Sequence, residues 1–241
     1  MQDTKNTNEW VNWIEESISK EYYIFYEQKH FSNIQKVGTG GFGKVYRASW
    51  KNSQYFALKS FFNFDDVTAK EIVHELKLQR DIQFHNNIIK FYGIAKFDPE
   101  NDDVQSKNYL LVMEYADSGP LKNYLKENFN NLTWDDKYNL AYQLACAVLC
   151  LHNEGIVHRD LHSGEKYDID LAIEISQGLR EEPIPDTPED YIKIYTECWN
   201  GEPDNRPTTN QVVETLKEII TKTNITTENN ISTSLNTDNS N

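Results

Sequence analysis

The pattern of apolar and polar residues divides the chain into a strand-rich first half and a helical second half. From Phe31 to Phe62 the pattern is typical of strands, with apolar runs on either side of a turn at residues 51–53. Residues 88–95 and 109–114 are two further strand candidates. The acidic segment 98–103 between them is expected to be a solvated loop. These runs predict a β-sheet.

One helix is predicted within the strand-rich half. Between residue 66 and about residue 84, Ile72, Leu76 and Ile82 share one helical face, and charged residues occupy the other. Another amphipathic helix is predicted within residues 1–30, where Trp10, Trp13, Ile14 and Ile18 recur at helical spacing ahead of an aromatic cluster at residues 22–26. We expect this helix to pack on the neighbouring lobe; a partner-binding helix is the alternative.

The second half carries helical signals. Thr133-x-x-Asp136 resembles a capping box. It opens a helix whose apolar face consists of Leu140, Leu144, Ala147, Val148 and Leu151. Further helices are predicted from residue 168 to a glycine cap at Gly178, from Thr187 to Trp199, and from Thr208 or Thr209 to Ile220. After Ile220, Thr, Asn and Ser dominate, so the remaining tail is expected to be disordered.

Composition and charge narrow the class of protein. The 241 residues are 38% hydrophobic and carry a net charge of −14, which is typical of a globular protein and disfavours nucleic acid or anionic membranes as partners. No apolar run reaches membrane-spanning length and the start of the chain does not resemble a signal peptide, so a cytoplasmic protein is expected. Cys146, Cys150 and Cys198 lack metal-site spacing and are expected to be free thiols.

A glycine-rich segment is the first candidate for chemistry. Gly38-x-Gly40-x-x-Gly43 also occurs in dinucleotide-binding folds, where a helix follows the glycines. Here Val45-Tyr46-Arg47-Ala48 continues as a strand instead, as in a glycine-rich hairpin that covers phosphates. Glycine allows the backbone to approach phosphate oxygens closely. Phe42 at the tip of the hairpin could shield the site from water.

A lysine in an apolar strand is the second candidate. Lys59 follows Ala57-Leu58, and a buried ammonium requires an anionic partner. Glu75, on the following helix, is the best candidate for that partner. The two residues could form a purely structural ion pair or could also hold phosphates. Further along, the apolar strand 111–117 breaks into Ser118-Gly119-Pro120.

The motif His158-Arg159-Asp160 follows the glycine-rich segment, Lys59 and the apolar strand 111–117 along the chain. With these motifs in this order, the chain resembles a protein kinase, nearest to the tyrosine-kinase-like group, over residues 31–164 and again over residues 167–220. The resemblance implies an α+β fold with a small β-rich N-lobe containing one helix and an incomplete, mainly helical C-lobe. The expected domains are a helical extension (1–30), an ATP-binding N-lobe (31–117), the incomplete C-lobe (118–220) and the tail (221–241).

The resemblance also implies the roles of individual residues. Asp160 would accept the proton of the substrate hydroxyl, and His158 and Arg159 would shape the catalytic loop. Met113 would occupy the gatekeeper position, and the backbone after it would meet adenine. The residues expected to bind ATP are Val37, Gly38, Thr39, Gly40, Gly41, Phe42, Gly43, Val45, Ala57, Lys59, Glu75, Met113, Glu114 and Ala116.

Part of the kinase pattern is missing. Glu165 stands where the family has a magnesium-binding Asn, and the sequence contains neither Asp-Phe-Gly nor Ala-Pro-Glu. A carboxylate at this position could hold Mg²⁺ in principle, but its loop context is absent, so no metal site is predicted. Asp168-x-Asp170 fits a helix N-terminus better than a metal site. Arg206, which pairs with the Glu of Ala-Pro-Glu in the family, is expected to be a buried charge without its partner.

Three hypotheses explain why some kinase motifs are present and others are missing. The chain is an ATP-binding pseudokinase that acts as a scaffold or decoy for signalling partners. Alternatively, it is an active serine/threonine or dual-specificity kinase that transfers the γ-phosphate of ATP to protein substrates. A third possibility is a splice or gene-model product of an intact kinase, because the missing segments form one block after Gly164. Loss of the central hydrophobic helix would also expose the apolar face of the helix 134–152.

Overall fold

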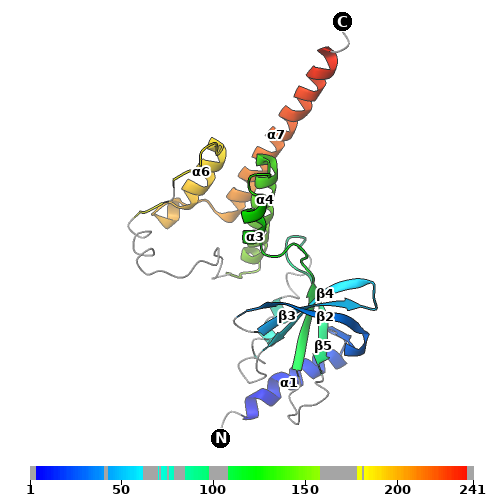
Figure 1. Ribbon diagram of the computed structural model, residues 1–241. Coiled ribbons are helices and arrows are strands. Elements are labelled where there is room, and N and C mark those ends of the chain that lie inside the picture. The colour runs from blue at the N-terminus through cyan, green and yellow to red at the C-terminus, as the bar shows by residue number, and fades with distance from the viewer. Residues whose placement is uncertain are drawn as a thin grey trace. The chain divides into compact units, whose positions relative to one another are not determined.

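The computed structural model describes residues 4–40, 43–61, 70, 72–74, 76–78, 85–97, 108–157, 178–180 and 182–237. The chain forms two compact units, Met1–Gly119 and Pro120–Asn241 (Figure 1). The boundary between the units lies two residues beyond the expected boundary between the lobes. Unit 1 contains the β-strands. The core of unit 2 is formed by its described helices.

Unit 1 is built on a six-stranded sheet with the order β1-β5-β6-β4-β3-β2. All neighbouring strands are antiparallel except β1 and β5, which are parallel. The strands are β1 (Ile24–Tyr26), β2 (Phe31–Thr39), β3 (Gly43–Trp50), β4 (Gln54–Phe61), β5 (Phe91–Phe97) and β6 (Asn108–Glu114). The sequence pattern did not predict β1, which is only three residues long and belongs to the aromatic cluster that follows the first helix.

The two faces of the sheet bury separate apolar clusters. On one face, Phe56, Leu58 and Val112 pack with aromatic side chains from β1 and β2. On the other face, Leu111 and Ile94 pack against two helical segments. These segments are α1 (Thr4–Ser19), which Figure 1 shows beside the sheet, and the helical residues within 70–78. The helix predicted over residues 66–84 is confirmed at its described residues 70, 72–74 and 76–78, and α1 packs on the neighbouring N-lobe sheet, as expected.

Unit 2 is helical. Its α-helices are α3 (Leu121–Asn128), α4 (Trp134–Asn153), α6 (Glu189–Cys198) and α7 (Thr209–Thr237), and a short 3-10 helix lies at Pro203–Asn205. A second short 3-10 helix, Gln28–His30, belongs to unit 1. Tyr138, Ile194, Leu216 and Ile219 form the buried core between α4, α6 and α7. The predicted capping box is confirmed: Thr133 Oγ accepts from the backbone N–H of Asp136, and the Asp136 carboxylate accepts from the backbone N–H of Thr133.

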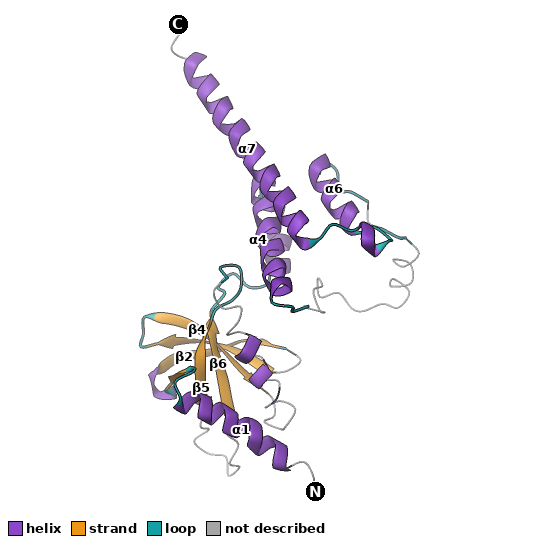
Figure 2. Cartoon of the chain, turned by 180° about the vertical axis from the view of Figure 1, so that it is seen from behind, coloured by secondary structure: helices purple, strands orange, loops and turns teal. Residues whose placement is uncertain are grey.

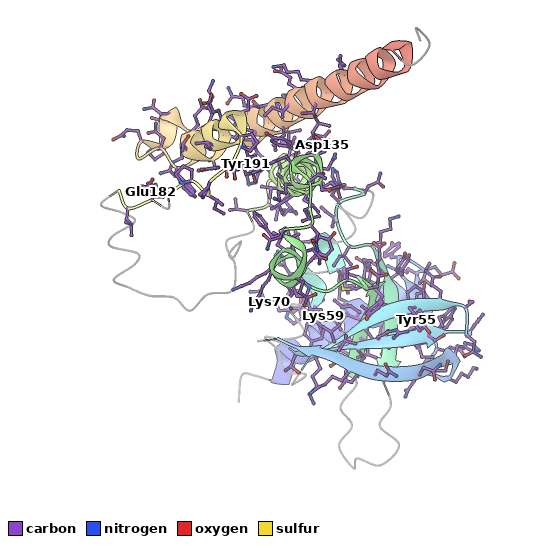
Figure 3. The ribbon with its side chains drawn as sticks, turned by 45° about the horizontal axis from the view of Figure 1, so that its top comes forward. Tyr55, Lys59, Lys70, Asp135, Glu182 and Tyr191 are labelled. Carbon is purple, nitrogen blue, oxygen red and sulfur yellow. The ribbon has the colours of Figure 1, made fainter. Side chains whose placement is uncertain are left out.

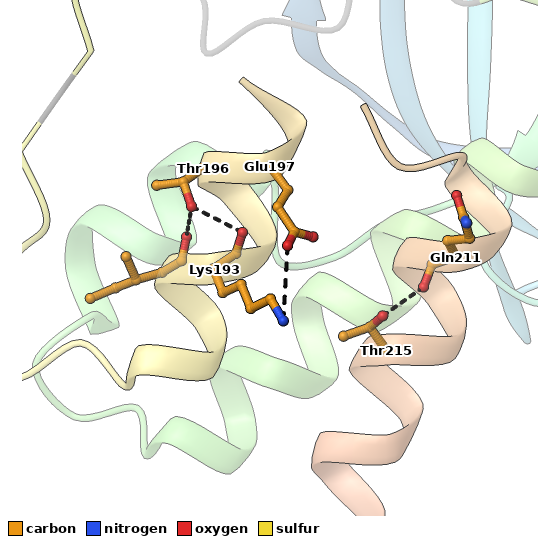
Figure 4. Close-up of polar contacts among 6 residues, drawn as sticks. Lys193, Thr196, Glu197, Gln211 and Thr215 are labelled. Atoms are coloured by element: carbon orange, nitrogen blue, oxygen red, sulfur yellow. Dashed lines mark hydrogen bonds and ion pairs between the residues drawn. The ribbon is translucent and has the colours of Figure 1, made fainter. Parts of the chain in front are cut away.

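Threonines within these helices bond to the backbone of their own helix. Figure 4 shows the Thr196 hydroxyl donating to the carbonyls of Ile192 and Lys193, and the Thr215 hydroxyl donating to the carbonyl of Gln211 at 2.9 Å. The same figure shows Lys193 Nζ at 4.0 Å from the Glu197 carboxylate, one helical turn away. A hydroxyl bonded to its own helix leaves the helical conformation of a Thr-rich segment intact.

The expected end of the last helix near Ile220 is wrong. α7 continues to Thr237, so residues 221–237 are helical rather than disordered (Figure 2). The segment from residue 209 to residue 237 contains no Gly or Pro that would interrupt a helix. Thr221 and Thr223 donate to carbonyls of the preceding turn, as Thr215 does. A helix nucleated by the packed residues before Ile220 therefore propagates into the polar segment.

Unit 2 also has an apolar cavity of about 800 Å³ that is open to solvent on one side. Its lining comes from α3, α4, α6, α7 and residues 182–187, and it includes Leu125, Leu144, Val148, Ile184 and Leu216. Leu144 and Val148 belong to the face of α4 that was expected to lose its partner surface. The predicted helix 168–178 lies outside the described residues except for Gly178, whose φ is +102°.

The cysteines and the hydrophobicity of the helices can be compared with the expectations from the sequence. Cys146, Cys150 and Cys198 are free thiols, as expected. Burial raises the pKa of the Cys198 thiol, which keeps it in its unreactive protonated form. In the part of the chain that the structure describes, no helix combines the length and the apolar character needed to cross a membrane.

Candidate functional site

Strand register brings most of the predicted nucleotide-binding residues to one face of the sheet in unit 1. Val45 on β3 lies directly opposite Lys59 on β4, and Lys59 lies opposite Leu111 on β6. Two residues along, Ala57 lies opposite Met113. Residues that are directly opposite in a sheet share a face, as do residues two apart on one strand. We call this surface, made by Val45, Ala57, Lys59, Leu111 and Met113, the Lys59 face.

The glycines of the motif differ in what surrounds them. A Cβ atom at Gly43 would lie 1.7 Å from the backbone oxygen of Ser60, so only glycine allows β3 and β4 to pair there. A Cβ atom at Gly38 or Gly40 would meet no atom of the described residues within 4 Å. The N–H of Gly40 donates to the carbonyl of Gly43 and closes the turn between β2 and β3. Gly43 is therefore required by the sheet, whereas Gly38 and Gly40 leave open space beside the backbone.

The Lys59 face is covered only in part. Leu111 is fully buried beneath α1 and the helical residues Ile72, Val73 and Leu76. Val45, Ala57, Lys59 and Met113 remain half-buried, and Val37 on β2 is 48% exposed. An apolar surface of this kind, interrupted by the cation of Lys59, is the chemistry that a planar, negatively charged ligand needs.

At the end of β6, beyond Met113, Glu114 already forms hydrogen bonds to Lys90. The N–H of Glu114 donates to the carbonyl of Lys90 at 2.8 Å, and the Glu114 carboxylate accepts from the N–H of Lys90 at 3.1 Å. Ala116 follows on an exposed stretch after the strand. Glu114 therefore joins β6 to the residue before β5, and the exposed backbone after it is the part that a ligand can reach.

Lys59 projects from β4, as Figure 3 shows with its label. Its Nζ lies 5.8 Å from the centre of the Phe61 ring, which is on the same side of the strand. Glu75 lies outside the described residues, although its neighbours His74 and Leu76 are helical. The ion pair between Lys59 and Glu75 therefore stays a prediction.

The catalytic motif and several other predicted residues cannot be placed. His158, Arg159, Asp160 and Glu165 lie outside the described residues, as do Asp168 and Asp170. In the glycine-rich turn the same holds for Gly41 and Phe42. Thr39 ends β2 and is exposed. The catalytic roles assigned to these residues remain expectations from the resemblance.

The expectation for Arg206 is wrong. Its side chain is exposed, its Nε donates to the carbonyl of Asn200 at 2.7 Å, and its Nη2 is 3.4 Å from the carbonyl of Gly201. Because the guanidinium is exposed and donates to two carbonyls, the charge does not carry the penalty of an unpaired buried ion.

Arg47 is a residue of the Lys59 face that the sequence analysis did not select. It lies opposite Ala57, and its guanidinium stacks 3.9 Å from the ring centre of Tyr55 and 5.6 Å from that of Tyr115. Figure 3 labels Tyr55 on β4. Its Nε is buried and has no hydrogen-bond partner among the described residues. The alternation from Val45 could have indicated that Arg47 shares its face.

Comparison with known proteins identifies the family of this arrangement. A model of the protein kinase domain matches residues 31–165, which is more than half of the chain. The chain belongs to the protein kinase family. The kinase match begins at Phe31, the first residue of β2, and runs through the sheet and α4 to the catalytic motif. α1 and β1 precede the matched kinase region, and α6 and α7 follow it.

Individual kinases show the same partial coverage. A probable serine/threonine-protein kinase of Dictyostelium discoideum is 32% identical over 145 residues, which are 58% of this chain and 15% of the relative. The probable serine/threonine-protein kinase zyg-1 of Caenorhabditis briggsae is 36% identical over 138 residues, 57% of this chain and 18% of the relative. LIM domain kinase 1 of Drosophila melanogaster is 30% identical over 130 residues, 54% of this chain and 10% of the relative. The chain therefore aligns with only a small part of each of these kinases.

Proposed function

We propose that this kinase-family chain binds ATP on the Lys59 face and transfers phosphate poorly or not at all. The observation that supports the binding proposal best is the register that sets Val45, Lys59 and Leu111 side by side on a half-open apolar face. Open space beside Gly38 and Gly40 at the adjoining turn supports it further. Together they provide an apolar platform, a cation and a stretch of backbone beside open space.

Each part of the site has a role in binding. Val45, Ala57 and Met113 contact the purine, and the backbone around Ala116 bonds to its edge. The backbone at Gly38 and Gly40 approaches the phosphates, because no described side chain lies beside these two glycines. Lys59, held by Glu75, neutralises the α- and β-phosphates in the manner of the family.

The proposal that phosphate transfer is impaired is based on the missing metal ligands. In active kinases an Asn of the catalytic loop and the Asp of Asp-Phe-Gly hold two Mg²⁺ ions. This chain has Glu165 in place of the Asn and no Asp-Phe-Gly. Metal ions supply several kcal/mol of transition-state stabilisation, and each 1.36 kcal/mol is a factor of ten in rate. Loss of both ligands should slow transfer by roughly 10³-fold or more.

Active phosphate transfer to serine or threonine is the second candidate function. It is favoured by the names of two similar proteins, both called probable serine/threonine-protein kinases, and by the presence of His158-Arg159-Asp160. The acceptor would then be a protein hydroxyl, with Asp160 as the base. His162 stands where serine/threonine kinases usually carry Lys, so the motif does not specify the acceptor residue.

Nucleotide titration of the purified chain tests the proposal. We expect ATP to bind with and without Mg²⁺ in calorimetry, and Lys59→Ala to abolish binding. Lys51→Ala, which removes an exposed lysine at the β3–β4 turn, serves as the matched control and should bind normally. Absence of ATP binding by the wild-type chain would contradict the binding proposal. Mg²⁺-dependent incorporation of γ-phosphate that is lost in Asp160→Ala would contradict impaired transfer and support the second candidate.

A further inference from the structure

The segment that follows β6 is held to the sheet at one side chain. From Glu114 to Asn123, a stretch that the structure describes without a gap, Tyr115 alone is not exposed. The Cζ atom of Arg47 on β3 lies 5.6 Å from the centre of its ring. Ala116, whose backbone is proposed to bond to the edge of the purine, is the next residue in the chain. The contact between Arg47 and Tyr115 therefore lies one residue from a part of the proposed nucleotide site.

Arg47 is in turn oriented by the sheet. Its Cζ atom lies 3.9 Å from the ring centre of Tyr55 on β4, which Figure 3 labels. Arg47 lies opposite Ala57, and Ala57 lies opposite Met113, so the register of three strands sets its position. A planar guanidinium that stacks on a ring keeps one orientation, whereas an ammonium is a point charge without a preferred plane. The ring of Tyr55 therefore supports the guanidinium that Tyr115 contacts.

The environment of Arg47 is poorly explained by stability alone. Its Nε atom is buried and has no hydrogen-bond partner among the described residues. A buried donor without a partner destabilises a folded protein, and an apolar side chain of similar length would avoid that loss. Groups that break such a rule are found mainly where a protein has a function to perform. This position therefore calls for a role in the site as well as in packing.

We propose that Arg47 is a positioning residue, which holds Tyr115 and thereby keeps the backbone of Ala116 beside the Lys59 face. Arg47 then raises the affinity for the purine through Tyr115, without a contact of its own to the nucleotide. This inference rests on the proposed function, because it assigns Arg47 a role in the same ATP site. There are two plain alternatives: the charge of Arg47 attracts the phosphates from a distance, or the stack adds only stability.

Arg47→Met removes the guanidinium, together with its unsatisfied donor, and keeps an unbranched side chain on β3. Lys36→Met is the matched control, because it removes the same charge from an exposed residue opposite Tyr46, on the other face of the sheet. If Arg47→Met does not fold, Arg47→Lys takes its place, since it keeps the charge and loses only the planar group.

Binding of ATP and of adenosine separates positioning from attraction by charge. Loss of a partly exposed cation–π contact corresponds to about a two- to fivefold change in an equilibrium. We expect Arg47→Met to weaken binding of both ligands by the same factor, within that range, and Lys36→Met to change neither. A loss confined to ATP, whose phosphates adenosine lacks, would show that Arg47 acts through its charge and would overturn the inference.

A double-mutant cycle shows whether the effect passes through Tyr115. Tyr115→Leu removes the ring that Arg47 contacts, so in this background Arg47→Met should have no additional effect on the affinity for adenosine. An equal effect in both backgrounds would show that Arg47 contacts the nucleotide itself and would overturn the inference. A stack that adds only stability would lower the melting temperature and leave the affinity of the folded protein unchanged, which would overturn it as well.

Backbone dynamics provide a readout that does not depend on nucleotide. In the nucleotide-free chain, the NMR order parameter of the Ala116 N–H should be about 0.85, the value of rigid backbone, and should fall toward about 0.6 in Arg47→Met but not in Lys36→Met. If the wild-type chain binds neither ATP nor adenosine but the order parameter falls as expected, the proposed function fails and the positioning role stands. A low value already in the wild type, or no fall in Arg47→Met, would overturn the positioning role.

Discussion

The hydroxyl of Tyr109 donates a 2.5 Å hydrogen bond to the carboxylate of Glu15, a residue 94 positions earlier in the chain. Tyr109 is almost completely buried on the Lys59 face, beside Ile94 and Leu111. Burial, followed by the hydrogen bond to Glu15, raises the pKa of the Tyr109 phenol far above its ordinary value. The phenol must stay protonated to donate this hydrogen bond between β6 and α1.

This bond predicts a loss of stability in alkali. A group whose pKa is raised in the folded state contributes fully below its unfolded pKa, which is about 10 for Tyr, and its contribution falls as the pH rises above that value. We expect the free energy of unfolding of unit 1 to fall above about pH 10, and Tyr109→Phe to flatten that fall. Urea unfolding followed by tryptophan fluorescence measures it. Tyr55→Phe, at a residue 49% exposed, is the control, and equal slopes in both variants would refute the assignment.

The glycines of the hairpin predict opposite outcomes for the same substitution. Gly43→Ala should destabilise unit 1 by about 1–3 kcal/mol, because the new methyl group would collide with the carbonyl of Ser60. Gly38→Ala should leave stability almost unchanged and weaken ATP binding, because its methyl group would enter the open space assigned to phosphate. Thermal unfolding and ATP titration of the two variants check this pair. Equal stabilities would show that β3 and β4 tolerate a side chain at Gly43.

The cap of α4 predicts a loss of stability in acid. Hydrogen bonds from the Thr133 hydroxyl and N–H lower the pKa of Asp136. A lowered pKa contributes stability above the unfolded value, about 4, and that contribution is lost as the pH falls below it. Thr133→Ala should therefore lower the melting temperature of unit 2 at neutral pH, with a difference that shrinks in acid. Thr133→Ser retains the hydroxyl and should behave as the wild type; a constant difference at all pH values would exclude the role of Asp136.

The cavity in unit 2 predicts that a larger side chain can stabilise the protein. Ala145 lines the cavity of about 800 Å³, whereas Ala147, two residues later on α4, does not. Ala145→Leu should raise the free energy of unfolding by about 0.5–2 kcal/mol by burying apolar surface in the empty space. Ala147→Leu should give no such gain. Differential scanning calorimetry compares the two, and destabilisation by Ala145→Leu would show that the space is filled in solution.

Local patterns predicted much of this fold correctly. The strands from Phe31 to Glu114, the capping box at Thr133 and the helix containing Ile72 and Leu76 are all present. Each depends on residues close together in the sequence, whose spacing alone selects a strand, a cap or a helical face. The sequence prediction of the length of α7 is wrong, because low hydrophobicity favours disorder whereas the absence of Gly and Pro allows the helix to continue to Thr237.

Other features depend on residues far apart, and sequence patterns carry little information about them. The motif Gly38-x-Gly40-x-x-Gly43 does not indicate that one glycine is needed by β4 and that the other two border open space. Nothing near Arg206 in the sequence indicates that it is exposed and bonded to Asn200. The stack of Arg47 on Tyr55 and Tyr115 likewise depends on the register of three strands.

The amino-acid sequence by itself determined the kinase family, the order of its motifs and the absence of Asp-Phe-Gly, because these are properties of adjacent residues. Only the tertiary structure decided that Val45, Lys59 and Leu111 share a face and that Tyr23 bonds to Leu76. Strand register and the docking of α1 arise from the packing of the whole unit, in which apolar burial selects one arrangement among many that the local patterns allow.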